Sequence, residues 1–222
     1  MYKVNDIFSS LQGEGHHTGR AATFVRFAGC NLRCPFCDTD FTHYREMSAE
    51  EIVESVKQYT TRFVVLTGGE PSLQIDDALV AALHKAGFYI AVETNGTRLL
   101  PEGIDWVTVS PKQPLTTTPL PQIESGRVNE IKVVFNGTAS DILLSVEHLE
   151  KNAEYTRDSF SNLPSSPTGG SQRGASPLLF LQPCDVGDAQ RNAEITRQCI
   201  EYIMQHPCWQ LSLQTHKLAN FK

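Results

Sequence analysis

Short apolar segments rich in β-branched and aromatic residues alternate along this chain with segments of helical periodicity. Because the apolar runs are continuous, they are typical of strands covered on both faces. Strands alternating with helices favour parallel βαβ units with right-handed crossovers, arranged as an open sheet or as part of a barrel. The predicted strands span residues 22–28, 63–67, 89–93, 106–110, 131–135, 178–182 and 211–214.

Helix signals lie between many of these strands. Ser48 and Glu51 have the spacing of a capping box at the start of a helix. Residues 96–129 contain five prolines and little helical pattern. At least one crossover is therefore predicted to be a loop, which favours a reduced barrel over a complete one. Three further helices are predicted to begin at Asp76, Ser140 and Asp188.

Length and charge narrow the class of protein. A chain of 222 residues with 40% hydrophobic content predicts a single α/β domain over residues 1–222. Residues 156–177 are rich in Ser, Pro, Gly and Asn, which predicts a flexible surface insertion, with a functional lid as the alternative. The net charge of −6 favours small-molecule substrates over nucleic acid. With no apolar run of signal-peptide or membrane-span length, the chain is predicted to be cytoplasmic, where its cysteines stay reduced.

Three cysteines stand close together at Cys30, Cys34 and Cys37, and no fourth is near enough in sequence to complete a thiolate cage. Structural zinc needs four protein ligands, whereas an iron–sulfur cubane held by three leaves one iron open for chemistry. The missing ligand favours the cluster. Zinc remains the alternative, with a fourth ligand drawn from Asp38, His43, His16 or His17.

Polar and glycine-rich motifs follow the predicted strands at their carboxyl ends. In a parallel α/β fold, ligands collect at these ends, so the motifs are predicted to converge on one site. Gly68 and Gly69 would let a ligand approach the backbone closely, and Glu70 is predicted to meet an ammonium group. The motifs begin at Cys30, Gly68, Glu93, Ser110 and Gln182.

The CxxxCxxC spacing resembles the signature of the radical S-adenosylmethionine (SAM) superfamily, and Gly68-Gly69-Glu70-Pro71 resembles its SAM-binding turn. A narrower resemblance is dispersed over nearly the whole chain and points to the 7-carboxy-7-deazaguanine synthase family. It is carried by LQGEG from Leu11, FVRFAGC from Phe24, CDT from Cys37, TGGEP from Thr67, ETNG from Glu93, VTVSPK from Val107, LQP from Leu181 and QTHK from Gln214.

This resemblance implies an α/β fold with a partial TIM-type barrel of about six parallel strands, the radical SAM core. It implies a lyase that converts 6-carboxy-5,6,7,8-tetrahydropterin into 7-carboxy-7-deazaguanine with loss of ammonia, on the route to queuosine. The implied cofactors are a [4Fe–4S] cluster, SAM and Mg²⁺. Reductive cleavage of SAM would yield a 5′-deoxyadenosyl radical that takes a hydrogen from C6 of the pterin.

The resemblance also assigns roles to residues, with no catalytic side chain beyond the cluster and the SAM radical. Cys30, Cys34 and Cys37 would hold the cluster, and the Thr39 hydroxyl would ligate Mg²⁺. Substrate would bind at Leu11, Gln12, Gly13, Arg26 and Thr67. SAM would bind at Phe36, Cys37, Asp38, Gly69, Ser110, Pro111, Lys112, Gln182, Pro183, Cys184 and Asp185. The same cavity is expected to include Glu14, Glu70, Glu93 and Asn95, whereas His16 and His17 are not expected to take part.

The implied partners are a second copy of the chain in a homodimer and a reductant such as flavodoxin or ferredoxin, with no nucleic acid and no membrane. Two alternatives stand beside the synthase. An activase of a glycyl-radical partner shares the CxxxCxxC spacing, but the motifs at Leu11 and Cys37 favour the pterin enzyme. A zinc-binding interaction module, from a different class, predicts a colourless protein without a cluster.

Overall fold

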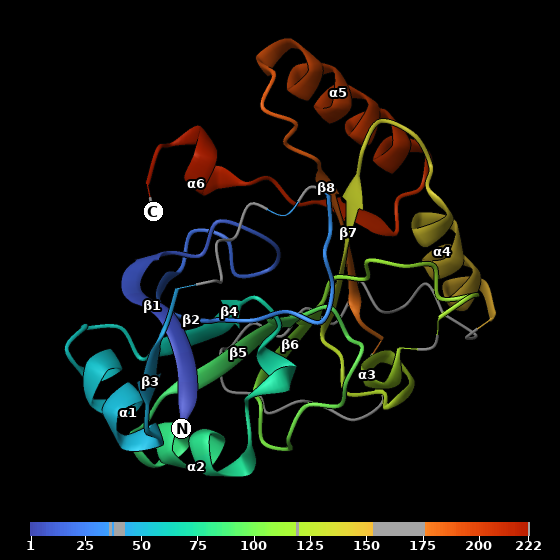
Figure 1. Ribbon diagram of the computed structural model, residues 1–222. Coiled ribbons are helices and arrows are strands. Elements are labelled where there is room, and N and C mark those ends of the chain that lie inside the picture. The colour runs from blue at the N-terminus through green and yellow to red at the C-terminus, as the bar shows by residue number, and fades with distance from the viewer. Residues whose placement is uncertain (36, 38–42, 119, 153–175, 222) are drawn as a thin grey trace.

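Nine strands form one sheet in the computed structural model, which describes residues 1–35, 37, 43–118, 120–152 and 176–221 (Figure 1). The strands are β1 (Tyr2–Leu11), β2 (Ala21–Phe27), β3 (Arg45–Met47), β4 (Phe63–Gly68), β5 (Tyr89–Thr94), β6 (Trp106–Val109), β7 (Glu130–Phe135), β8 (Leu178–Pro183) and β9 (Trp209–Leu211). The helices are α1 (Ala49–Lys57), α2 (Asp77–Lys85), α3 (Pro121–Glu124), α4 (Asp141–Asn152), α5 (Ala189–Gln205) and α6 (Thr215–Leu218), with a 3₁₀ turn η1 at Pro71–Leu73.

The sheet is open and mostly parallel. Its order is β3-β1-β2-β4-β5-β6-β7-β8-β9, and the strands from β2 to β9 run parallel to one another, whereas β1 is antiparallel to both β2 and β3. Because the edge strands β3 and β9 are not paired with each other, the α/β fold with an incomplete barrel is confirmed. In the described part of the chain the parallel run contains seven strands, whereas the resemblance implied about six.

The helix starts follow the predicted caps. In each case a side-chain oxygen accepts a hydrogen bond from the backbone N–H three residues later, which satisfies an amide that the helix leaves unpaired. Around Ser48 the full capping box is present, because the Glu51 side chain also bonds the Ser48 amide. The four caps are Ser48 on α1 at 3.2 Å, Asp76 on α2 at 3.0 Å, Ser140 on α4 at 3.2 Å and Asp188 on α5 at 2.7 Å.

Some elements differ from the prediction. The last strand was expected at 211–214, but β9 is Trp209–Leu211; beyond it the Ser212 amide still bonds Leu181 on β8, whereas the Gln214 side chain bonds Glu14 in the loop after β1. The strands β1 and β3 and the short helices α3 and α6 were not predicted. The expected loop crossover is confirmed, since residues 95–105 between β5 and β6 contain no helix.

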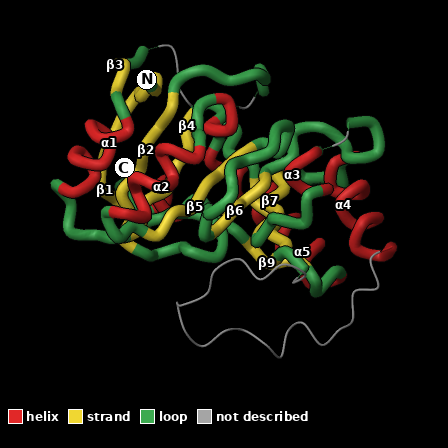
Figure 2. Tube along the Cα trace, turned by 90° about the horizontal axis from the view of Figure 1, so that it is seen from below, coloured by secondary structure: helices red, strands yellow, loops and turns green. Residues whose placement is uncertain are grey.

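Two apolar cores lie on the two faces of the sheet. The larger core lies between the sheet and the helices, with α1 and α2 against its first half and α4 and α5 against its second half (Figure 2). The smaller core lies on the inner face and contains Ala22, Phe63, Val65 and Ala91. Successive strand residues point to opposite faces, so β2, β4 and β5 supply side chains to both cores. Among the helices that the structure describes, none combines the length and apolar character that a membrane crossing requires.

Truncation of Leu83 to Ala should destabilise the fold, because this α2 side chain is 0% exposed in the larger core. A buried Leu→Ala change leaves a cavity and costs about 2–5 kcal/mol of unfolding free energy. Leu144→Ala on α4 is the matched control, since that leucine is 50% exposed. Urea unfolding of both variants tests the assignment of the core, and equal losses would contradict it.

Candidate active site

A cavity of about 700 Å³ opens on the inner side of the sheet, toward the carboxyl ends of its parallel strands. Of the predicted residues, Pro111 does not line it, and Phe36, Asp38 and Thr39 lie outside the described residues. Glu14, Glu70, Glu93 and Asn95 also line the cavity. The other predicted residues in its wall are Leu11, Gln12, Gly13, Arg26, Cys30, Cys34, Cys37, Thr67, Gly69, Ser110, Lys112, Gln182, Pro183, Cys184 and Asp185.

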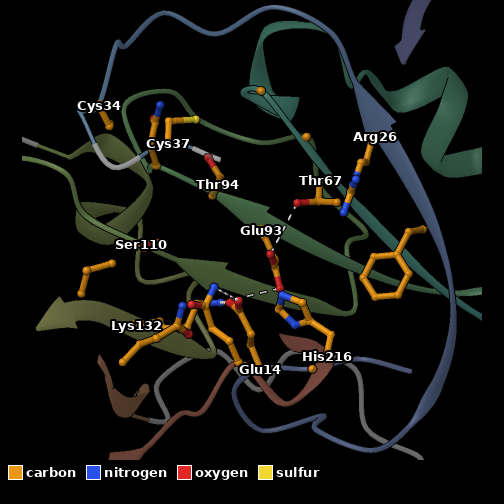
Figure 3. A pocket seen from close by; sticks show the side chains of 18 of the residues that line it. Glu14, Arg26, Cys34, Cys37, Thr67, Glu93, Thr94, Ser110, Lys132 and His216 are labelled. Atoms are coloured by element: carbon orange, nitrogen blue, oxygen red, sulfur yellow. Dashed lines mark hydrogen bonds and ion pairs between the residues drawn. The ribbon is translucent and has the colours of Figure 1, made fainter. Parts of the chain in front are cut away.

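Strand alternation selects which side chains face this cavity. On β2 and β7 both neighbours of the lining residue belong to the larger core on the opposite face, and on β4 and β5 the residue before it does. The inward side chains from four strands therefore come together although they are far apart in sequence (Figure 3). They are Arg26, Thr67, Glu93 and Lys132.

The cysteine loop lies at the mouth of the cavity. Cys30 and Cys34 are half-buried and Cys37 is exposed, and all three line the cavity wall. Burial raises the pKa of Cys30 and of Cys34, and the charge on Cys37 adds to both rises. Thiolates at these three positions would therefore repel one another, and a bound cation would reduce this electrostatic repulsion.

The turn at Gly69 fits closely against the cysteine loop. A Cβ atom on Gly69 would lie 1.9 Å from the Gly29 carbonyl oxygen, so no larger residue fits. The Glu70 amide donates to the same carbonyl at 2.9 Å. The sequence suggested that the glycines leave room for a ligand, whereas at Gly69 it is the protein's own backbone that needs the space.

The Glu70 side chain is occupied mainly within the protein. It is 1% exposed and accepts hydrogen bonds from the Ser72 amide at 3.0 Å, the Thr94 hydroxyl at 2.6 Å and the Asn95 amide at 2.7 Å. A carboxylate has about four acceptor positions, and these three hydrogen bonds occupy most of them. Glu70 therefore joins the end of β5 to the turn after β4, and little of its capacity is left for the expected ammonium group.

A buried ion cluster forms the inner wall of the cavity. The Lys132 ammonium is bonded to the Glu14 carboxylate and lies 3.8 Å from Glu93. Glu93 also accepts from Gln12 at 2.9 Å and from the Thr67 hydroxyl at 3.4 Å. These residues come from the loop after β1 and from β4, β5 and β7, and Figure 3 shows Glu14, Glu93 and Lys132 directed toward one another.

Burial and charge act in opposition within this cluster. Burial alone would raise the pKa of Glu14, but the charge and hydrogen bond of Lys132 outweigh it and lower that pKa to about 2. Burial likewise opposes the charged form of Lys132, but Glu14, Glu93 and Glu130 together raise its pKa. Glu130 is 2% exposed, and burial raises its pKa to about 7 against the opposing charge of Lys132. Glu130 is therefore the carboxyl group of this cluster that titrates near neutral pH.

The loop from residue 12 to residue 20 bridges the two ends of the open sheet. The Gly13 carbonyl accepts from the amide and the hydroxyl of Thr215, both at 3.0 Å, and the Gly15 amide donates to Ser212 at 2.9 Å. A Cβ on Gly13 would lie 2.3 Å from Nδ1 of His216, and one on Gly15 would lie 2.1 Å from Glu130. Both glycines are therefore required by the close approach of the loop to the far strands.

His16 and His17 lie at the opposite end of the strands from the cysteines. His16 stacks on Trp106 with ring centroids 4.6 Å apart, and His17 meets the edges of Phe63 and Tyr89. These aromatic residues begin β4, β5 and β6, whereas Cys30 follows the carboxyl end of β2. Neither histidine is therefore a fourth ligand for a metal held by the cysteines, and burial lowers the pKa of His17 to about 3.

Several residues of the cavity wall are not among those predicted from the sequence. Lys132 lies in an apolar run and was assigned only to a strand, although a lysine in such a run is itself a signal of a buried partner. Arg26 lies over the ring of Phe8 at 4.8 Å, and Phe8 stacks on Phe24 at 5.2 Å, so two aromatic side chains support the guanidinium. The other missed residues are Asn5, Leu32, Thr94, Val134, Gln214, His216, Lys217 and Phe221.

Comparison with known proteins identifies the family. Residues 24–115 match the Radical SAM superfamily. The chain is 45% identical to a 7-carboxy-7-deazaguanine synthase of Bacteroides thetaiotaomicron over 100% of both chains, and 40% identical to that of Bradyrhizobium diazoefficiens over 97% of both. The chain belongs to the 7-carboxy-7-deazaguanine synthase family. Its fold is similar to the crystal structure of QueE from Escherichia coli, with a TM-score of 0.73 and 29% identity over 96% of this chain and 93% of that one.

Family membership confirms the predicted class, a radical SAM lyase with a [4Fe–4S] cluster, SAM and Mg²⁺ as cofactors. Such an enzyme acts on a small molecule and needs a reductant. Membership also favours the synthase over the glycyl-radical activase and the zinc module.

The residues present suit the cluster. Within the described part of the chain, no three His, Cys, Asp or Glu side chains already converge as a cage for a single ion. Three thiols line one cavity wall, and thiolates are ligands that suit the irons of an iron–sulfur cluster.

Replacement of Glu130 by Gln should alter how stability depends on pH. The native carboxyl group keeps its proton up to about pH 7, whereas the unfolded one loses it near 4.5. The native state therefore binds more protons between these values, and wild-type stability falls as the pH rises through that window. Relative to wild type, Glu130→Gln should gain on the order of 1–3 kcal/mol between about pH 5 and pH 8, at roughly 1.4 kcal/mol per pKa unit. Urea unfolding at both pH values measures the gain, and a difference that does not vary with pH would contradict the assignment.

Proposed function

We propose that the protein converts 6-carboxy-5,6,7,8-tetrahydropterin into 7-carboxy-7-deazaguanine with loss of ammonia, in the biosynthesis of queuosine. The observation that carries this proposal is a single cavity that joins three thiols at its mouth to a buried set of charged side chains in its wall. Full-length similarity to curated 7-carboxy-7-deazaguanine synthases supports the same substrate and product.

Cys30, Cys34 and Cys37 would hold the cluster, which together with SAM supplies one-electron chemistry that generates a carbon-centred radical. The rest of the chain binds and orients the substrate and excludes water. Arg26 is suited to the substrate carboxylate, because a guanidinium offers paired donors that match two carboxylate oxygens. Its place over the Phe8 ring limits the directions in which those donors point.

Glu14 and Glu93 are suited to the other edge of the substrate. A reduced pterin carries several N–H donors, and buried carboxylates accept such donors strongly. Lys132 keeps Glu14 ionised, so the acceptor is present across the physiological pH range. Gln12 and Thr67 bond Glu93 and hold its carboxylate in place. The substrate positions proposed by resemblance, Leu11, Gln12, Gly13, Arg26 and Thr67, lie around this pair of carboxylates in the cavity wall.

The remaining assignments are also proposals. Thr39 would ligate Mg²⁺, and Phe36, Cys37 and Asp38 would border SAM together with Gly69, Ser110, Pro111 and Lys112. Gln182, Pro183, Cys184 and Asp185 would complete that site. Support for Lys112 comes from its bond to Ser110 at 2.7 Å at the cavity wall. Support is weaker for Asp185, whose carboxylate accepts from Gly187, Asn192 and Lys217.

We further propose that residues 1–222 act as one radical SAM domain in a cytoplasmic homodimer, reduced by a flavodoxin or ferredoxin. Similarity to the QueE structure over 96% of the chain supports the single domain. The dimer and the identity of the reductant rest on resemblance to the family alone.

Anaerobic reconstitution with iron and sulfide, followed by dithionite, SAM, Mg²⁺ and carboxytetrahydropterin, should yield the deazapurine detected by mass spectrometry. Cys34→Ala should abolish SAM cleavage, because the cluster loses one of its three protein ligands. Cys208→Ala is the matched control, since that thiol lies outside the cavity wall. A fully active Cys34→Ala enzyme, or an intact cluster that gives no product, would refute the proposal.

Arg26→Gln should raise the Michaelis constant for the pterin while leaving SAM affinity near wild type. Loss of a charged hydrogen-bonding partner costs roughly 1.5–3 kcal/mol, or about ten- to a hundredfold. Arg62→Gln offers a comparison, because Arg62 also lies over an aromatic ring, that of Phe88 at 5.3 Å, but outside the cavity wall. Steady-state kinetics with each substrate varied in turn separate the two constants. An unchanged value for the pterin would remove Arg26 from the substrate site.

A further inference from the structure

Ser212 connects the loop after β1 to the end of β8. It follows β9 directly and is 1% exposed. Its hydroxyl oxygen accepts a hydrogen bond from the Gly15 amide at 2.9 Å, and the same hydroxyl donates to Oε1 of Gln182 at 3.0 Å. Gly15 follows Glu14, and both Glu14 and Gln182 line the cavity. One buried serine therefore lies between two segments that the proposed function assigns to different ligands, the pterin and SAM.

The hydrogen bonds of this hydroxyl fix the orientation of the Gln182 side-chain amide. A serine hydroxyl has one hydrogen to donate and two lone pairs that accept. Because the Gly15 amide can only donate, the hydroxyl hydrogen is given to the other neighbour, Oε1 of Gln182. If the Gln182 amide were turned over, the buried hydroxyl hydrogen would lose its acceptor, which is costly. The NH₂ group of Gln182 is therefore directed away from Ser212.

Gln182 is the residue at the end of β8 whose side chain offers N–H donors to a neutral acceptor. Pro183 has no N–H group, the Cys184 amide donates to the Phe135 carbonyl at 2.7 Å, and an ionised Asp185 carboxylate can only accept. A nucleoside carries ring nitrogens and hydroxyl oxygens, which accept such donors. The orientation of this one amide therefore matters for any nucleoside bound at the end of β8.

The substrate side of the loop has anchors of its own. The Gly13 carbonyl accepts two hydrogen bonds from Thr215, both at 3.0 Å, and the Glu14 carboxylate is bonded to Lys132. These contacts do not involve the Ser212 hydroxyl. Its removal should therefore leave the acceptors for the pterin in place and release mainly the amide on the SAM side.

We propose that Ser212 is a positioning residue for SAM. Its hydroxyl, itself held by the Gly15 amide, holds the Gln182 side-chain amide so that the NH₂ group meets a nitrogen or oxygen acceptor of the nucleoside. The same hydroxyl gives the SAM side and the substrate side of the cavity a common fixed point. This inference rests on the proposed function, because Gln182 meets SAM only if the cavity is that of a radical SAM enzyme.

The first test measures the dissociation constant for SAM and the Michaelis constant for the pterin in reconstituted Ser212→Ala enzyme. Loss of one neutral hydrogen bond should weaken SAM binding by roughly three- to tenfold. The Michaelis constant for the pterin should stay near wild type, whereas a general loosening of the loop would raise it and overturn the proposal. Ser212→Thr keeps the hydroxyl and should bind SAM nearly as well as wild type. A Thr variant as weak as the Ala variant would also count against the hydroxyl.

A double-mutant cycle with Gln182→Ala shows whether Ser212 acts through Gln182. Ser212→Ala should weaken SAM binding in the wild-type background and change it little in the Gln182→Ala background, because residues that act as a unit are not additive. Equal factors in the two backgrounds would show that the serine acts independently, and the positioning role would be wrong.

Ser145→Ala on α4 is the matched control. Ser145 is 4% exposed, accepts from the Leu115 amide at 3.0 Å and donates to the Ile142 carbonyl at 2.7 Å, but it lies outside the cavity wall. It should leave both constants unchanged, and an equal loss of SAM affinity there would assign the effect to any buried hydroxyl. Wild-type enzyme that makes no deazapurine with dithionite would refute the proposed function. An active wild type whose SAM affinity is unaffected by Ser212→Ala would refute the positioning role alone.

Discussion

The buried ammonium group of Lys132 is the interaction on which the site depends. It lies on β7 and holds Glu14, from the loop after β1, and it approaches Glu93 on β5. One cation cannot balance three carboxylates when one of them is buried and two are half-buried, because each uncompensated charge away from water is costly. Glu130 avoids an uncompensated charge because it keeps its proton up to about pH 7. The ion cluster thereby links strands that an open sheet leaves apart, and it keeps two charged acceptors inside the cavity.

The loop that carries Glu14 also packs against the start of the strands. After Gly15 the chain continues into His16 and His17, whose rings pack on Trp106 and Phe63 at the start of the strands. Burial lowers the pKa of His17 to about 3, so its imidazole is uncharged at neutral pH. This ring therefore adds no positive charge to the ion cluster that Glu14 joins.

Local signals made much of the fold predictable. Caps at Ser48, Asp76, Ser140 and Asp188 mark real helix starts, because a cap is a contact between residues three apart. Strand ends converge on one cavity for the topological reason that parallel strands share an edge. What could not be predicted depends on long-range contacts. Glu14 and Lys132 are 118 residues apart, and Ser212 and Gln214, which follow the last strand, bond Gly15 and Glu14 in the loop after β1. No short window of sequence contains either contact.

Resemblance located the Gly68-Gly69-Glu70 turn as a ligand site, but its contacts within the protein explain why these residue types are needed. The Glu70 amide donates a hydrogen bond to the Gly29 carbonyl, and the Glu70 carboxylate accepts hydrogen bonds from Thr94 and Asn95 at the end of β5. Asn95 then bonds Asn31 in the cysteine loop. The loop that would hold the cluster is thus tied to the strand whose Glu93 faces the substrate side of the cavity. Reaction between a radical and one carbon atom requires these two sides to be oriented closely. A Cβ atom at position 69 would lie 1.9 Å from the Gly29 carbonyl oxygen, so only a glycine lets the turn lie this close to the cysteine loop. That orientation is therefore set by the backbone before either cofactor or substrate binds.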